Sequence, residues 1–263
     1  MRMRTSVLPF LLMPLLLAAP LRAQETPATG PWKGSLTAAL SVSSGNTDSN
    51  SLNLAADAER KTDHDKLSLY GKFLRSRAES TVDGVVVRTT TAYQWSAGTR
   101  YDRNLTPRVF GFGGLDLSHD EIRLLDLRSA LSAGLGYHLL QQPEHTWDVY
   151  AGLSRRADRY LDPGVRVDDV LRTRYAVSEL LLGEESSHAL TESTRFKQKL
   201  VIIPALDQHQ GTRATFDAGL QVALNKTMSL SVSLQRRYDG AAQAPLEKND
   251  TLLLTGLNVK FGG

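Results

Sequence analysis

Apolar and polar side chains alternate along most of this chain, and this alternation limits what it can fold into. From Trp32 to Val42 the even positions are apolar or small and the odd positions are mostly polar. Successive side chains of an extended strand point to opposite faces, so such a stretch predicts a strand with one apolar and one polar face. The pattern returns after each turn signal and predicts about twelve strands. The segment from Arg172 to Gly183 is the least regular, because Leu180 and Leu182 compete in register with Tyr175, Val177 and Leu181.

A soluble β-sandwich also alternates, but two features favour a membrane barrel. The expected strands reach about ten residues, the length that crosses a bilayer at a tilt, whereas soluble strands have about five or six. The connections are alternately short and long, as in outer-membrane barrels with short periplasmic turns and long outer loops. The expected long loops are residues 76–84, 156–171 and 239–249.

Aromatic residues fall at the ends of the expected strands, on the apolar face. Such residues form two girdles at the interfaces of the membrane. If the first strand starts in the periplasm, one rim carries Trp32, Tyr101, Tyr137, Trp147 and Phe261, and the other carries Phe73, Tyr175 and Tyr238.

The sequence therefore predicts an all-β protein, a transmembrane antiparallel up-and-down β-barrel. In hydrocarbon every backbone N–H and C=O must be paired within the protein, so the first and last strands have to meet. With an even number of strands they meet antiparallel, and both termini lie in the periplasm.

Residues 1–23 are expected to be a secretory signal peptide, with a basic start, an apolar run and a small residue before the cut. Residues 24–31 read as a disordered lead-in and residues 32–263 as the barrel. Arg2, Arg4 and Arg22 precede the cut, and without them the 31 basic residues fall to the number of acidic ones, 28. A nucleic-acid partner is therefore not expected. The chain has no cysteine, which excludes disulfides and thiolate chemistry.

The stretch "SSGNTDSNSL" places Asn46, Asp48 and Asn50 at the spacing of a calcium loop. The glycine that such a loop needs at its sixth position would be Ser51, and the glutamate at its twelfth would be Asp57. Gly, Asn and Asp between two alternating runs are typical of turns, so we expect the first outer hairpin here.

Several stretches carry a family resemblance, among them "WKGSLTAALSVSSGNT", "AERKTDHDKLSLYGKF", "TRFKQKLVIIPALD" and "NVKF". The most specific are the GNT at residues 45–47 and the turn at residues 101–108. The chain resembles the salt-induced outer-membrane proteins from Trp32 to Phe261, a family whose shared domain is of unknown function. The resemblance implies an outer-membrane barrel, an osmotic role and no catalytic residues. Gly262 and Gly263 depart from the pattern, because outer-membrane barrels usually end on the aromatic residue that the assembly machinery reads.

The inward face of the expected barrel is charged, and its basic residues outnumber its acidic ones. By parity the basic residues are Lys33, Lys66, Lys72, Arg88, Arg100, Arg108, Arg128, Arg195, Lys197, Lys199, Arg213 and Lys260. The acidic ones are Asp57, Glu59, Asp102, Asp116, Asp126, Asp148 and Asp217. Two interpretations stay open: a lumen filled by paired charges, and a narrow water-filled channel that favours small anions.

The sequence offers little for catalysis. None of the six histidines has a second one at the spacing of a metal pair, and no cofactor site is expected. His119 and Asp120 lie in an expected outer loop, where a lipid-acting enzyme could place its base, but no nucleophile motif accompanies them. We therefore expect a non-enzymatic envelope protein whose partners are outer-membrane lipid and the assembly machinery, with the lipid-acting enzyme as the alternative.

Overall fold

The computed structural model describes residues 31–43, 48–82, 85–167, 170–207, 211–242 and 246–262. The expected signal peptide and the tip of the first hairpin, residues 44–47, lie outside this part of the chain. The described elements are all strands: β1 (Trp32–Ser43), β2 (Asp48–Lys61), β3 (Asp65–Val82), β4 (Val85–Asn104), β5 (Val109–Asp120), β6 (Leu125–Gln141), β7 (His145–Tyr160), β8 (Val165–Val167), β9 (Val170–Arg172), β10 (Arg174–Ala189), β11 (Thr194–Pro204), β12 (Thr212–Ala223), β13 (Met228–Asp239) and β14 (Asn249–Phe261).

Twelve of the described strands form one closed antiparallel barrel, which confirms the predicted fold class and strand number, and β8 and β9 form a separate two-stranded sheet. Neighbours in the sheet are neighbours in sequence, except that β7 pairs with β10 because the small β8–β9 hairpin is inserted between them. The first and last strands meet antiparallel, with Leu36 opposite Val259. Among the described residues, no helix has the length and hydropathy needed to cross a bilayer.

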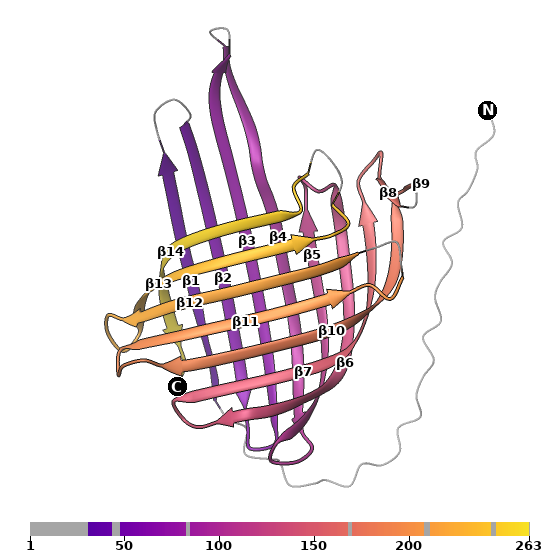
Figure 1. Cartoon of the computed structure of the whole chain (residues 1–263). Coiled ribbons are helices and arrows are strands. Elements are labelled where there is room, and N and C mark those ends of the chain that lie inside the picture. The colour runs from indigo at the N-terminus through magenta and orange to yellow at the C-terminus, as the bar shows by residue number, and fades with distance from the viewer. Residues whose placement is uncertain are drawn as a thin grey trace, which may run out of the picture.

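Two walls of the barrel face each other at a large angle. In Figure 1, β1–β5 run along the long direction of the view, whereas β10–β14 run across them. The walls join through the β1–β14 pair on one side and through β6, β7 and β10 on the other.

Two of the three expected long loops are wrong. Residues 76–82 continue β3, which pairs with β4 up to Val82 opposite Val85. This hairpin projects beyond the other strands in Figure 1, and β5 pairs with β4 only from Gln94 onward. Likewise β7 runs on to Tyr160 before the β8–β9 hairpin. Both segments were hidden in the sequence because polar residues occupy both of their faces.

The outer face of the barrel carries large apolar side chains in the open. Leu131, Leu153 and Leu253 are each more than 60% exposed. The register of β10 also becomes clear, since Leu182 is on the exposed face whereas Val177 and Glu179 are buried. Opposite them on β7 lie Arg156 and Ser154, which are buried as well.

Inside the barrel, three aromatic rings form a compact core. Phe110 and Phe112 of β5 and Tyr150 of β7 are buried and pack with Leu181. Glycines on the neighbouring strands make room for them, because a Cβ on Gly136 of β6 would collide with the ring of Phe110 and one on Gly183 of β10 with the ring of Tyr150. These rings fill part of the lumen on the side of the short turns.

We predict that Gly136→Ala destabilises the barrel by about 1–3 kcal/mol, because the added methyl group overpacks the site of Phe110. Urea unfolding from detergent micelles measures this. The control is Gly113→Ala on the outer face, where the nearest atom to an added Cβ is 3.9 Å away, with an expected change within about 0.5 kcal/mol. Equal effects of the two substitutions would contradict the packing described here.

Candidate functional site

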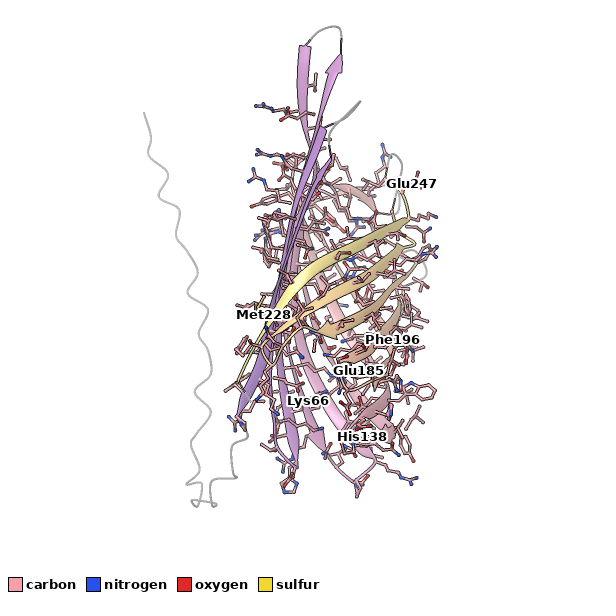
Figure 2. All side chains as sticks on the ribbon, turned by 90° about the vertical axis from the view of Figure 1, so that its left-hand side faces the viewer. Lys66, His138, Glu185, Phe196, Met228 and Glu247 are labelled. Atoms are coloured by element: carbon pink, nitrogen blue, oxygen red, sulfur yellow. The ribbon has the colours of Figure 1, made fainter. Side chains whose placement is uncertain are left out.

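Inward-facing charged side chains pair with one another across the lumen instead of lining an open channel. Lys66 of β3 lies 3.5 Å from Glu185 of β10 and 3.5 Å from Asp102 of β4. Glu185 also lies 3.5 Å from Lys199 of β11. Because β3 and β10 belong to facing walls, this network spans the lumen, and Figure 2 shows Lys66 and Glu185 between the two walls.

Arg100 of β4 ties this network to the aromatic core. Its Nε donates to Asp102 at 2.7 Å. Its guanidinium carbon lies 4.4 Å from the ring centre of Phe112 and 4.3 Å from that of Tyr150. A guanidinium stacks well on aromatic rings while still donating at its edge. Charge and rings therefore form one layer across the lumen.

Further contacts cross the lumen between this layer and the end of the barrel opposite the short turns, which we call the outer mouth. Lys72 of β3 lies 3.9 Å from Asp217 of β12. Arg237 of β13 donates to Gln94 of β4 at 2.7 Å. At the mouth Arg123, which lies between β5 and β6, donates to Asp250 of β14 at 2.7 Å. The facing walls are thus joined at four successive levels.

A second group of charges, which we call the arginine cluster, lies in the outer half of the wall. It consists of Arg128, Arg156, Asp158, Glu179 and Arg213. Arg128 makes two hydrogen bonds of 2.8 Å to Asp158, which also pairs with Arg156. Arg156 donates to Glu179 at 2.9 Å, and Arg213 donates to both oxygens of Glu179 at 2.9 and 3.0 Å. Both carboxylates are almost completely buried. The cluster therefore fastens β6, β7, β10 and β12 together.

Sequence reasoning missed four members of the Lys66 network and the arginine cluster, Arg156, Asp158, Glu179 and Glu185, and it also missed Arg123, Arg237 and Asp250. Arg156 and Asp158 fell in an expected loop, Glu179 in the irregular segment from Arg172 to Gly183, and Glu185 just after that segment. A signal was present, since Ser154, Arg156, Asp158 and Tyr160 continue the polar row that begins with Asp148. Asp158, Glu179 and Glu185 reduce the surplus of basic residues that parity alone predicted, but basic residues remain in the majority.

Other residues expected in the lumen have local partners. Asp57 accepts from Ser35 at 2.6 Å, and Asp116 accepts from Tyr70. Arg195 donates to Ser187 at 3.3 Å. Lys33 stands opposite Glu59 in the sheet, and Lys197 is exposed.

Three residues expected in the lumen lie elsewhere. Arg88 is in the projecting part of the β3–β4 hairpin, where it donates to Glu79 at 2.7 Å. Arg108 is in the β4–β5 turn and reaches Tyr137. Asp126 lies where the β6–β7 register shifts, and it pairs with Arg159 on the outward row of β7. Alternation along a strand fails to place these residues for three reasons. Arg88 lies in a hairpin that projects from the barrel, and Arg108 lies in a turn, where side chains do not alternate between two faces. Asp126 lies at a register shift, which changes the face to which the following side chains point.

The expected rim aromatics mostly lie on the outer face. Trp32, Tyr101, Tyr137, Trp147 and Phe261 occupy turn-side strand ends and are 38–45% exposed, and Tyr238, on the other rim, is 38% exposed. Phe73 contacts Tyr93 edge to face. Tyr175 departs from the pattern, because it lies opposite Asp158 in the sheet, on the inward register, and its hydroxyl donates to Asp207 at 2.8 Å.

His119 is built into the wall instead of a loop. It lies at the outer end of β5, stacks on Trp95 with ring centres 6.1 Å apart, and its Nδ1 lies 2.8 Å from the carbonyl oxygen of Asp126. Within the described residues no group of three or more side chains could hold a metal ion. A cavity of about 210 Å³ opens at the outer mouth and is lined by Gln94, Arg123, Arg237 and Asp250 among others.

We predict that Asp158→Ala costs about 3–5 kcal/mol of stability, because it leaves Arg128 and Arg156 buried without their shared carboxylate. Urea unfolding of the folded barrel measures the change. Glu79→Ala is the matched control, since it breaks the exposed pair with Arg88 and is expected to cost at most about 1 kcal/mol. A loss for Asp158→Ala as small as the control's would mean that the arginine cluster contributes little.

Solved outer-membrane proteins are similar to this chain at low sequence identity. The NanC porin is 6% identical, with 87% of this chain and 97% of that one covered and a TM-score of 0.47. An outer membrane channel of Pseudomonas putida F1 is 12% identical, with 94% and 100% covered and a TM-score of 0.46. The translocator domain of the autotransporter NalP from Neisseria meningitidis is 10% identical, with 92% and 90% covered and a TM-score of 0.45.

Sequence comparison gives a relative and a family. The uncharacterized protein YdiY of Escherichia coli (strain K12) is 25% identical over 206 residues, which cover 78% of this chain and 73% of the relative. A family model matches residues 36–261, almost the whole barrel. The chain therefore belongs to the family described as "Protein of unknown function, DUF481".

Proposed function

We propose that this chain is a non-enzymatic barrel of the bacterial outer membrane whose lumen is closed by its own side chains, and that it serves as a structural component of the envelope. The observation that carries the proposal is the pairing of Lys66 with Glu185 between facing walls. Together with Arg100 and the rings of Phe112 and Tyr150, this pair occupies the lumen at that level and obstructs the passage of a solute. The contacts of Lys72, Arg237 and Arg123 repeat this closure toward the outer mouth.

The outer face supports a location in the membrane. Leucines such as Leu131 and Leu153 have exposed side chains on consecutive strands. A soluble monomer rarely exposes such a large apolar surface. Aromatic residues at the strand ends fit the interfacial girdles of an outer-membrane barrel. The expected signal peptide would deliver the chain to this compartment. The link to osmotic conditions is carried over from the family resemblance.

A narrow ion channel is the second candidate, and one observation favours it. The crossing lysines are not tightly buried, since 26% of the side chain of Lys66 and 43% of that of Lys72 are exposed. Their carboxylate partners lie 3.5 and 3.9 Å away, longer than a good charge-assisted hydrogen bond. Such pairs could part and open a charged path.

The enzyme alternative is not favoured. The ring of His119 stacks on Trp95, and its Nδ1 is hydrogen-bonded to the carbonyl oxygen of Asp126. Nothing in its described surroundings supplies an activated nucleophile, which a lipid-acting site of this kind requires.

We predict that the folded wild-type protein gives no steady conductance steps in a planar bilayer. The double variant Lys66→Ala/Lys72→Ala should give discrete steps, because it removes two of the contacts that cross the lumen. Folding is checked first by the shift in gel mobility on heating and by circular dichroism.

The control for this experiment is Lys33→Ala/Lys197→Ala, which removes two exposed lysines expected to face the lumen. It should stay silent. Steady conductance steps from the wild type would contradict the closed lumen and favour the ion channel. A Lys66→Ala/Lys72→Ala variant without conductance steps would show that these two pairs are not the barrier.

The membrane location generates a separate prediction. Leu131→Arg, on the outer face of β6, should cost about 2–4 kcal/mol when the protein folds into lipid vesicles, because it places a charge in hydrocarbon. Leu190→Arg, in the turn after β10, should cost at most about 1 kcal/mol. A stability unchanged by Leu131→Arg would speak against lipid contact at this face.

A further inference from the structure

Two histidines face each other at the turn-side end of the barrel wall. His145 begins β7, and His188 is the next-to-last residue of β10. The two stand directly opposite in the antiparallel pair, on the same outward row as Trp147. The β7–β10 pairing is continuous from Arg174 to His188, so the backbone under both histidines is fixed.

The two imidazoles turn the same nitrogen toward each other. Nδ1 of His145 and Nδ1 of His188 are 3.3 Å apart, with ring centres at 5.5 Å. Two nitrogens on a tetrahedral Zn²⁺ ion, each at about 2.0–2.1 Å, are separated by about 3.3–3.4 Å. The spacing of the histidines therefore equals the edge of a zinc coordination tetrahedron.

We propose that His145 and His188 form a binding site for a divalent transition-metal ion, held between the two Nδ1 atoms. Neutral imidazole is a preferred ligand of Zn²⁺, Cu²⁺ and Ni²⁺, whereas Mg²⁺ and Ca²⁺ prefer oxygen ligands. No group of three metal-binding side chains occurs in the described part of the chain. The protein supplies two ligands, and solvent completes the coordination.

Binding would have a defined structural effect. His145 follows the β6–β7 turn, and His188 precedes the β10–β11 turn, with Ala189 donating to the carbonyl oxygen of Glu144. A bound ion would add one covalent-like bridge at the last rung between β7 and β10. Because a proton competes for the same nitrogen, the bridge would weaken in acid.

The test is a calorimetric titration of the folded mature chain, without a histidine tag, with ZnCl₂ near neutral pH. The expected result is one saturable site. His145→Gln and His188→Gln should each weaken binding by roughly tenfold or more, because each leaves a single ligand. The matched control is His64→Gln in the exposed β2–β3 turn, which should leave the affinity unchanged.

Electron paramagnetic resonance with Cu²⁺ provides an independent readout. The wild type should show coupling to two nitrogen ligands, and each single variant should show one. MgCl₂ should give no saturable heat. The proposal is overturned if ZnCl₂ finds no saturable site in the wild type, if either single variant keeps full affinity, or if His64→Gln loses as much as His145→Gln. In each case the two rings would be only a hydrogen-bonded pair.

Discussion

The pairing of β1 with β14 is the constraint on which the rest of the barrel depends. It joins the two ends of the chain and removes the edge that an open sheet would present to lipid, where an unpaired backbone N–H or C=O costs several kcal/mol. Once the sheet is closed, each strand has one face toward the outside of the barrel and one toward the lumen. Every other feature follows from what those two faces must satisfy.

The inward face meets this requirement with charge. A lumen narrow enough for facing walls to touch is poorly solvated, so each charge in it needs a partner. The arginine cluster supplies partners along the wall, and Lys66, Lys72 and Arg237 find theirs on the opposite wall. Glycines allow Phe110 and Tyr150 to fill the part of the lumen near the short turns. The same side chains thus hold the walls together and, in the proposed function, obstruct the path between them.

Much of the fold could be predicted from the sequence, because the period of two survives wherever the outer face of a strand is apolar. Leu36 and Leu131 mark such strands directly. The pattern was lost in the outer part of β7, where Arg155 and Arg159 occupy the outward positions, and in the upper β3–β4 hairpin, which has left the barrel. Partners across the lumen could not be predicted. The meeting of Lys66 with Glu185 depends on how the walls cross, and parity only states that both point inward.

The projecting hairpin of β3 and β4 has a consequence for the aqueous side of the molecule. Between Val85 and Tyr93 the outer edge of β4 has no partner in β5, whose pairing begins at Gln94. The hairpin therefore carries a run of backbone donors and acceptors without a neighbouring strand in β5, and it projects beyond the other strands (Figure 1). Arg88 and the threonines at residues 89–91 stand along this edge and keep it hydrated, which discourages the edge-to-edge stacking that an apolar strand would invite. The sheet of the barrel is thus paired all the way round, whereas along this part of β4 only the polar side chains of the hairpin oppose the addition of a further strand.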